Sequence, residues 1–285
     1  MTIPKIQKKK KSGEKITMVT CYDATWAAIV EEAGIDMTLV GDSLGMVIQG
    51  HDSTLPVTVD DIIYHCRAVS RGLKDSHLIA DMPFMSYQGP KREAMKNAGR
   101  MIKEGRAESI KLEGGEEIAD LVQAIDKVGI PVMAHIGLKP QQVHKMGGYK
   151  IQGRSPKEED VILKEARVLE EAGAYALLME GISLEVAQEV TEQASIPTIG
   201  ISSGPYCDGQ VLVLYDLLGL NPDFKPKFVK HYTKLYPEAL EALKDYKTEV
   251  EKKKFPTFEH SFSQNIIDIS RKSKAKTKTK SKIKS

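Results

Sequence analysis

The chain has 285 residues, of which 41% are hydrophobic and 28% charged, and this is the composition of an ordinary globular protein. It excludes collagen and an intrinsically disordered chain. No stretch reaches the roughly 18 to 20 apolar residues of a membrane helix, and the first 15 residues lack the apolar run of a secretory signal. The three cysteines have no C-x-x-C spacing, which excludes a disulfide framework and a thiolate zinc site. We therefore expect a soluble cytoplasmic protein.

The net charge of +2 conceals an uneven distribution. Residues 1–15 carry +5 and residues 271–285 carry +8, which leaves −11 on residues 16–270. We expect a basic N-terminal segment over residues 1–15 and a disordered, lysine-rich tail over residues 263–285, because the tail has too little apolar surface to order. Basic arms can bind nucleic acid, but no aromatic side chain is interleaved for base stacking. Solvated segments are the favoured interpretation at both ends, and nucleic acid is not an expected partner.

Between these ends, short β-rich apolar runs alternate with longer stretches of helical period, which is typical of βα units. The expected strands are residues 17–21, 37–40, 77–80, 109–112, 132–136, 175–179, 198–201 and 211–214. Helical periodicity over residues 90–102 and the Ser-Pro-x-Glu start at residues 155–158 predict intervening helices. Eight such strands close most economically into a (β/α)8 TIM barrel, with an open doubly wound sheet as the alternative. We place the barrel domain and a C-terminal helical extension at residues 16–262.

Polar side chains recur at the C-terminal ends of the expected strands, where the active sites of such barrels are built. They are Asp42, Ser43, Asp81, Lys111, Glu113, His135 and Glu180. Each acid alone could be a helix cap or a solvated loop residue, and His135 could equally be a core residue with satisfied hydrogen bonds. Two long loops, residues 44–57 and 137–154, follow the second and fifth strands. Recurrence at strand after strand favours one shared site.

The chemistry of these residues indicates a hard metal ion. Lys111 and Glu113 are two positions apart, so in a strand both point into the barrel, either as a buried ion pair or as part of a site. Carboxylates without thiolates or an H-x-x-x-H pair favour Mg²⁺ over zinc, and a lysine beside the cation suits an anionic substrate group such as a carboxylate. Motifs for nucleotide, hydrolase and redox sites are absent from the sequence. The glycines near residues 147–150 could form a flexible lid or a plain turn.

Longer strings contain these strand-end residues. They are Gly-Asp-Ser-Leu-Gly-Met at 41–46, Gln-Gly-His-Asp-Ser-Thr-Leu-Pro-Val-Thr at 49–58, Ala-Asp-Met-Pro-Phe-Met at 80–85, Lys-Leu-Glu-Gly-Gly at 111–115, His-Ile-Gly-Leu-Lys-Pro-Gln at 135–141, Gly-Gly-Tyr-Lys-Ile-Gln-Gly-Arg at 147–154 and Asp-Gly-Gln at 208–210. Together, in order from about residue 17 to residue 226, they closely resemble the ketopantoate hydroxymethyltransferase family.

The resemblance implies a cytoplasmic homodecamer of barrels from the phosphoenolpyruvate/pyruvate superfamily. It implies transfer of a hydroxymethyl group from 5,10-methylenetetrahydrofolate to 3-methyl-2-oxobutanoate, through a Mg²⁺-stabilised enolate, to give 2-dehydropantoate and tetrahydrofolate in pantothenate biosynthesis. It also implies three groups of site residues: Asp42, Asp81 and Glu113 for the metal, Asp42, Ser43, Asp81 and Lys111 for the 2-oxo acid, and Glu180 as the proton acceptor. His135 is a further candidate.

Two strings depart from the family pattern. Glu180 is followed by Gly-Ile-Ser at 181–183 where the family usually has Cys-x-Pro, and residues 202–203 are Ser-Ser where it usually has Gly-Ala. Because Glu180 is retained, we expect these changes to affect loop detail more than chemistry. The alternative function is that of a folate-independent C–C lyase acting on a 2-oxo acid, and folate dependence of turnover would separate the two.

Overall fold

Eight parallel strands form a closed barrel in this computed structural model, which describes residues 1–148 and 150–262. Each strand is hydrogen bonded to the next along the chain, and the last pairs with the first. The strands are β1 (Ile16–Thr20), β2 (Met37–Val40), β3 (His77–Asp81), β4 (Ser109–Glu113), β5 (Val132–Gly137), β6 (Ala176–Glu180), β7 (Thr198–Ile201) and β8 (Gly209–Leu212). The predicted (β/α)8 barrel is confirmed, and the doubly wound alternative is wrong.

The prediction of β8 was displaced by two residues. This strand begins at Gly209, whereas the prediction ran over residues 211–214, and Leu214 already belongs to the short helix α10 (Leu214–Leu217). Gly209 lies opposite Ile16 of β1, and a Cβ at Gly209 would lie 2.5 Å from the Ile16 carbonyl oxygen. A glycine is therefore required inside this strand by the close approach of β1, which strand propensity does not reveal.

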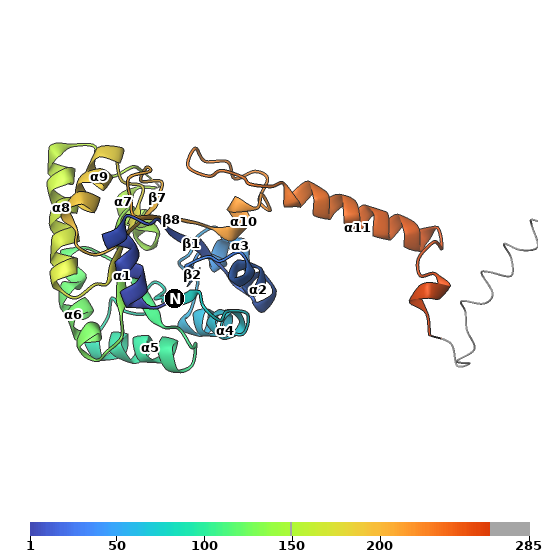
Figure 1. Ribbon diagram of the computed structural model, residues 1–285, viewed down its shortest axis with the longest axis horizontal. Coiled ribbons are helices and arrows are strands. Elements are labelled where there is room, and N and C mark those ends of the chain that lie inside the picture. The colour runs from blue at the N-terminus through green and yellow to red at the C-terminus, as the bar shows by residue number, and fades with distance from the viewer. Residues whose placement is uncertain (149, 263–285) are drawn as a thin grey trace, which may run out of the picture. The chain divides into compact units, whose positions relative to one another are not determined.

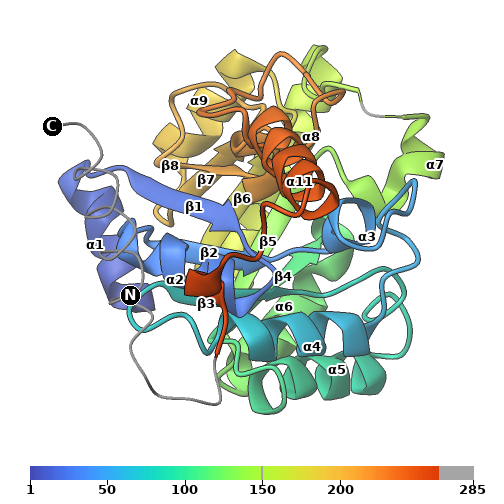
Figure 2. The same cartoon turned by 90° about the vertical axis from the view of Figure 1, so that its right-hand side faces the viewer.

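Helices surround the strands (Figure 2). They are α2 (Ala24–Glu32), α3 (Leu44–Val47), α4 (Val59–Val69), α5 (Lys91–Lys103), α6 (Ala119–Lys127), α7 (Val143–Met146), α8 (Pro156–Glu171) and α9 (Leu184–Gln193), with 3₁₀ turns η1 (Glu116–Ile118) and η2 (Pro140–Gln142). The predicted start of α8 is confirmed, because the Ser155 side chain accepts a hydrogen bond from the Glu158 amide. The apolar faces of the longer helices pack on the outside of the barrel in the larger of two buried clusters.

The smaller cluster fills the barrel interior with apolar side chains that include Met37, Ile79, Met133 and Leu178. Because alternate residues of each strand point inward, the inward positions at the strand C-termini lie above this apolar layer. The fold therefore presents the last inward residues of several strands to one end of the barrel, where the predicted polar residues stand.

The N-terminal basic run is a packed helix, α1 (Ile3–Ser12), drawn in dark blue in Figure 1. Ile6 is fully buried among the residues of the barrel interior. Lys9 Nζ lies 2.6 Å from Asp36 Oδ1, and Lys10 Nζ lies 2.8 Å from Asp208 Oδ2. The prediction of a solvated segment is wrong here, because two lysines of the run form ion pairs with carboxylates that directly precede β2 and β8.

A second unit begins at Thr233 and contains α11 (Leu235–Glu251) and η3 (Phe258–His260). No residue of α11 is buried. The predicted disordered tail, residues 263–285, lies outside the described residues, as does Tyr149 in the loop considered as a lid. Within residues 1–148 and 150–262, no helix is long and apolar enough to cross a membrane.

Candidate active site

The structure brings the predicted polar residues to the C-terminal ends of neighbouring strands. Asp81, Glu113 and Glu180 are the last residues of β3, β4 and β6, and Asp42 follows β2 closely. Lys111, Glu113 and His135 point into the barrel and are almost fully buried. Parallel strands place all these ends on one side, so residues up to 138 positions apart in the chain form one cluster.

Lys111 is the cation of this cluster. Its Nζ lies 2.6 and 2.7 Å from the two carboxylate oxygens of Asp81 and 3.6 Å from Glu113 Oε1. Burial alone would lower the pKa of Lys111, but the charges of Asp81, Glu113 and Asp42 outweigh it and raise that pKa. Lys111 is therefore a fixed ammonium, suited to hold an anion and unsuited to act as a neutral amine nucleophile.

The carboxylates around Lys111 crowd one another. Burial raises the pKa of Asp42 well above its usual value, and the charges of Asp81 and Glu113 raise it further. Burial also raises the pKa of Asp81, in spite of Lys111. The Asp42 amide donates a hydrogen bond to Asp81 Oδ2 at 3.1 Å. When Asp42, Asp81 and Glu113 are all ionised and Lys111 is protonated, this buried cluster has a net charge of −2.

This donor set fits a hard dication. All its acidic ligands are carboxylate oxygens, which Mg²⁺ prefers, and a charge of +2 would balance the excess. Among the described residues, no three His, Cys, Asp or Glu side chains are placed so that they could together hold a metal ion. Mg²⁺ characteristically takes one or two protein carboxylates and completes its shell with substrate and water, so not all three acids need to be direct ligands.

His135 lies between two carboxylates. Its Nδ1 is 3.5 Å from Glu113 Oε1, and its Nε2 is 3.4 Å from Glu180 Oε2. Neither ring nitrogen makes a well-aligned hydrogen bond to the described residues. Burial would raise the pKa of Glu113, but Lys111 and His135 together lower it. His135 therefore connects the cluster around Lys111 with Glu180 on the next strand.

Glu180 differs from the other acids of the site. Its side chain is 22% exposed, at the open end of β6. Burial raises its pKa to about 7, and the charge of Glu113 adds to this effect while His135 opposes it. A carboxylate that is half ionised near neutral pH is matched to accept a proton and release it again.

Two hydroxyl groups lie in the loops that follow β2 and β7. Ser43 follows Asp42, and its Oγ lies 2.8 Å from the hydroxyl oxygen of Tyr22. Ser203 is fully buried; its Oγ donates to the Met179 carbonyl at 2.8 Å and accepts from the Ile182 amide at 3.2 Å. Ser203 thus ties together the two sides of Glu180, and it is one of the positions at which the sequence departs from the family pattern.

Four residues of the site were not predicted from the sequence: Tyr22, Tyr87, Gln141 and Ser203. Gln141 stands in one of the quoted strings, and its place after the fifth strand was the only signal.

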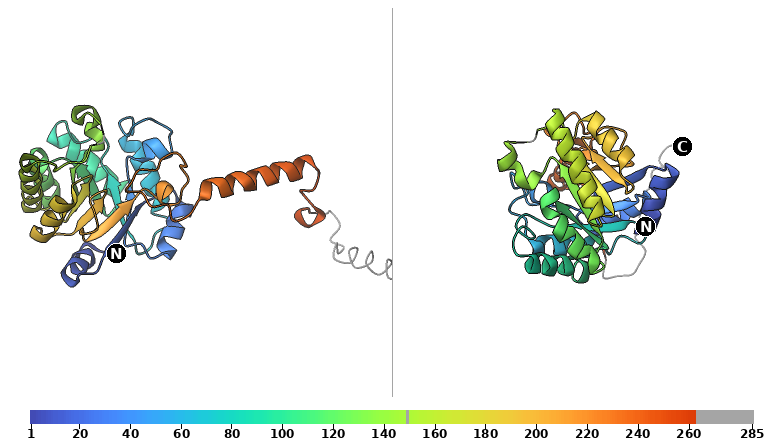
Figure 3. Two further views of the ribbon diagram at one scale, coloured as in Figure 1. Left: turned by 90° about the horizontal axis from the view of Figure 1, so that it is seen from above. Right: turned by 90° about the vertical axis from the view of Figure 1, so that its left-hand side faces the viewer.

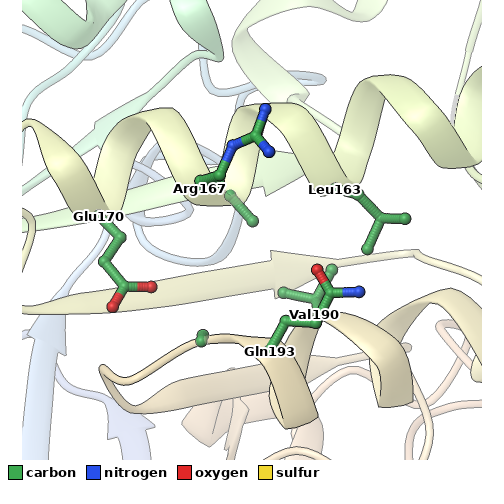
Figure 4. A pocket seen from close by; sticks show the side chains of 7 residues that line it. Leu163, Arg167, Glu170, Val190 and Gln193 are labelled. Carbon is green, nitrogen blue, oxygen red and sulfur yellow. The ribbon is translucent and has the colours of Figure 1, made fainter.

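A small pocket on the outside of the barrel is unrelated to the site. It lies between α8 and α9, which pack side by side (Figure 3), and its walls are Leu163, Ala166, Arg167, Glu170, Val190, Gln193 and Ala194 (Figure 4).

The site at the strand C-termini of this (β/α)8 barrel contains a buried cluster of acids with one lysine, and beside the cluster lies an acid whose pKa is raised. These features define a class of enzyme that acts on small anionic molecules. The sequence model described as ketopantoate hydroxymethyltransferase matches residues 1–258. The chain therefore belongs to the ketopantoate hydroxymethyltransferase family.

Individual relatives agree with this assignment. A 3-methyl-2-oxobutanoate hydroxymethyltransferase of Geobacter metallireducens is 53% identical over 92% of this chain and 98% of its own length. One of Thermotoga maritima is 53% identical over 92% of this chain and 97% of its own. Among solved structures, 2,3-dimethylmalate lyase, a member of the PEP mutase/isocitrate lyase superfamily, has a TM-score of 0.59 at 16% identity and covers 97% of this chain and 99% of its own. A phosphonopyruvate hydrolase complex with oxalate and Mg²⁺ has a TM-score of 0.59 at 13% identity, with 97% and 98% covered. At these identities the solved structures show the shared fold alone.

Proposed function

We propose that this chain transfers a hydroxymethyl group from 5,10-methylenetetrahydrofolate to 3-methyl-2-oxobutanoate, giving 2-dehydropantoate and tetrahydrofolate. The observation that carries the proposal is the position of Glu180, whose pKa is raised to about 7, across His135 from the cluster of Lys111 and three carboxylates. One side of the site can hold an anionic 2-oxo acid while the other removes a proton from it. The relatives named for this reaction supply the identity of the substrate.

The residues around Lys111 bind the 2-oxo acid. The Lys111 ammonium faces the substrate carboxylate, and the Ser43 hydroxyl and the Asp42 and Asp81 carboxylates complete the contact surface. Asp42, Asp81 and Glu113 would hold Mg²⁺, which would supply positive charge to stabilise the enolate that forms when C3 loses its proton. Because Lys111 stays protonated, no Schiff base forms with the substrate.

Glu180 acts as the base. It takes the proton from C3 of the bound 2-oxo acid, and the electron pair of the C–H bond moves into an enolate. Water adds to the methylene carbon of the folate and the two C–N bonds of that carbon break, which leaves tetrahydrofolate and a one-carbon unit at the oxidation level of formaldehyde. The enolate carbon forms a bond to this unit, and the proton held by Glu180 goes to its oxygen, which becomes the hydroxyl of the product. Ser203 fixes the backbone on both sides of Glu180, which keeps the carboxylate over the substrate.

Proton exchange observed by NMR tests this function. The purified chain is incubated with 3-methyl-2-oxobutanoate and Mg²⁺ in D₂O, with and without 5,10-methylenetetrahydrofolate. We expect deuterium to enter C3 without the folate, and 2-dehydropantoate to appear only with it. Turnover of a 2-oxo acid without folate would instead support a C–C lyase, and the absence of C3 exchange would contradict the proposed base.

The assembly and location of the enzyme are also proposals. On the family resemblance we propose a homodecamer in the cytoplasm, with the 2-oxo acid and the folate as its small-molecule partners. Analytical ultracentrifugation of the full chain tests the assembly, since a decamer and a monomer differ tenfold in mass.

A further inference from the structure

The Gln141 side chain uses every hydrogen-bonding position that it has. It stands in η2 after β5 and is only 4% exposed. Its Nε2 donates to Asp42 Oδ2 at 3.0 Å and to the Met82 carbonyl at 2.9 Å. Its Oε1 accepts from the Tyr87 hydroxyl at 2.8 Å and from Gln88 Nε2 at 3.1 Å. A backbone carbonyl can only accept, so the nitrogen of the amide must face Met82, and the orientation of the side chain is fixed.

The backbone of Gln141 holds a second acid of the site. Its amide donates to Glu113 Oε2 at 3.1 Å. One residue of the fifth βα loop therefore binds one oxygen of Asp42 and one oxygen of Glu113. Of the remaining oxygens, Asp42 Oδ1 accepts no hydrogen bond from the described residues, and Glu113 Oε1 faces Lys111 and His135 at 3.5 to 3.6 Å.

Tyr87, in the third βα loop, makes hydrogen bonds to both Gln141 and Glu113. Its hydroxyl accepts from the Glu113 amide at 3.1 Å and lies within donating distance of Gln141 Oε1 and of the Glu113 carbonyl. The position of Glu113 is thus coupled to the Gln141 side chain through one buried phenol.

We propose that Gln141, held by Tyr87, is the positioning residue that fixes the Asp42 and Glu113 carboxylates relative to each other, so that both present their remaining oxygens to the same cation. Two buried carboxylates repel each other, and donors that bind one oxygen of each oppose that repulsion and set the direction of the other oxygen. Gln141 acts through these acids and has no part in the proton transfer. The inference rests on the proposed function, because it assumes the Mg²⁺ site of that function.

Calorimetric titration of Mg²⁺ in the presence of saturating 3-methyl-2-oxobutanoate tests the inference on the full chain. Gln141→Met keeps the length of the side chain and removes its donors and acceptor. We expect Mg²⁺ affinity to fall by roughly 10- to 100-fold, the usual effect of removing a residue that orients metal ligands. The matched control is Gln142→Met in the same 3₁₀ turn, whose native side chain makes no hydrogen bond to the described residues, and its affinity should stay within twofold of wild type.

Tyr87→Phe provides a second, independent variant. It removes only the hydroxyl, so we expect a smaller loss of Mg²⁺ affinity in the same direction. Because both residues act on the same two acids, the double variant should lose less than the product of the two single losses. This variant also carries the test if Gln141→Met fails to fold, which a thermal melt would show.

The outcomes separate this inference from the proposed function. If the wild-type chain binds no Mg²⁺ with the 2-oxo acid, the metal part of the proposed function fails, and the role of Gln141 fails with it. If the wild type binds Mg²⁺ but folded Gln141→Met and Tyr87→Phe bind it equally well, only the positioning role is overturned. A lower melting temperature with unchanged Mg²⁺ affinity would show that Gln141 is structural. At saturating Mg²⁺, C3 exchange by Gln141→Met should return to within a few-fold of wild type.

Discussion

Replacement of Glu180 by glutamine should make the protein inactive and, above neutral pH, more stable. Glutamine keeps the shape of the side chain and removes both its charge and its basicity. The proposed base for C3 is lost, so deuterium exchange at C3 should slow by roughly 10²- to 10⁴-fold, the usual contribution of a positioned general base. The gain in stability follows from the same raised pKa that suits Glu180 to its role.

The size of this gain depends on pH. The pKa of Glu180 is raised from 4.5 to about 7 in the folded protein, mainly by burial. Below pH 4.5 both states hold the proton, and the acid costs nothing. Between pH 4.5 and 7 the unfolded chain loses the proton while the folded chain keeps it, so stability falls as pH rises, and above 7 the penalty is constant. At about 1.4 kcal/mol per pKa unit, the penalty is about 1 kcal/mol at pH 5 and about 3 kcal/mol at pH 8.

Urea unfolding at pH 5 and pH 8, in Mg²⁺-free buffer with a chelator, measures this difference. The free energy of unfolding of Glu180→Gln should exceed that of the wild type by about 3 kcal/mol at pH 8 and by much less at pH 5. The control is Glu185→Gln, an exposed acid in the first turn of α9, which should change little at either pH. An equal gain at both pH values, or a loss at pH 8, would refute the assignment of a raised pKa to Glu180.

Three other predictions test the remaining parts of the structure. Asp42→Ala or Asp81→Ala should abolish Mg²⁺ binding measured by calorimetry with the 2-oxo acid, and unchanged affinity in both would reject the metal assignment. Lys10→Met should lower the free energy of unfolding by about 1–2 kcal/mol because a partly buried carboxylate loses its charged partner, whereas the exposed Lys8→Met should have no effect in the same urea titration. Ser203→Ala should lower it by about 1–3 kcal/mol by leaving buried backbone groups without a partner, and should also slow C3 exchange; a neutral result in both assays would contradict its role beside Glu180.

The residues at the strand ends could be predicted from the sequence because two simple rules place them. Residues two apart in a strand share a face, and parallel strands end on the same side of a barrel. These rules place Asp81, Glu113 and Glu180 together even though 99 positions separate the first from the last. No knowledge of side-chain rotamers is needed for that step, so the acidic character of the site is already present in the sequence pattern.

The contacts between loops could not be predicted in the same way. Gln141 meets Asp42 across 99 positions of sequence, and the contact depends on the path of the fifth βα loop, which no periodicity describes. The docking of α1 was missed for a related reason. Its lysine-rich composition predicts a solvated segment, whereas one buried isoleucine, Ile6, and two carboxylates on other elements hold it against the barrel.

The departures from the family pattern gain a physical meaning only in three dimensions. In the sequence, the change after Glu180 and the change after β7 are 20 positions apart and look like separate small-for-small substitutions. In the structure the Ser203 hydroxyl binds the Ile182 amide and the Met179 carbonyl, which lie on either side of Glu180. An alanine at 203 could make neither bond, so the two loops of this chain are joined by a side chain that the expected alanine would not supply. The serine at position 203 therefore adds hydrogen bonds from the loop after β7 to the backbone on both sides of the proposed base.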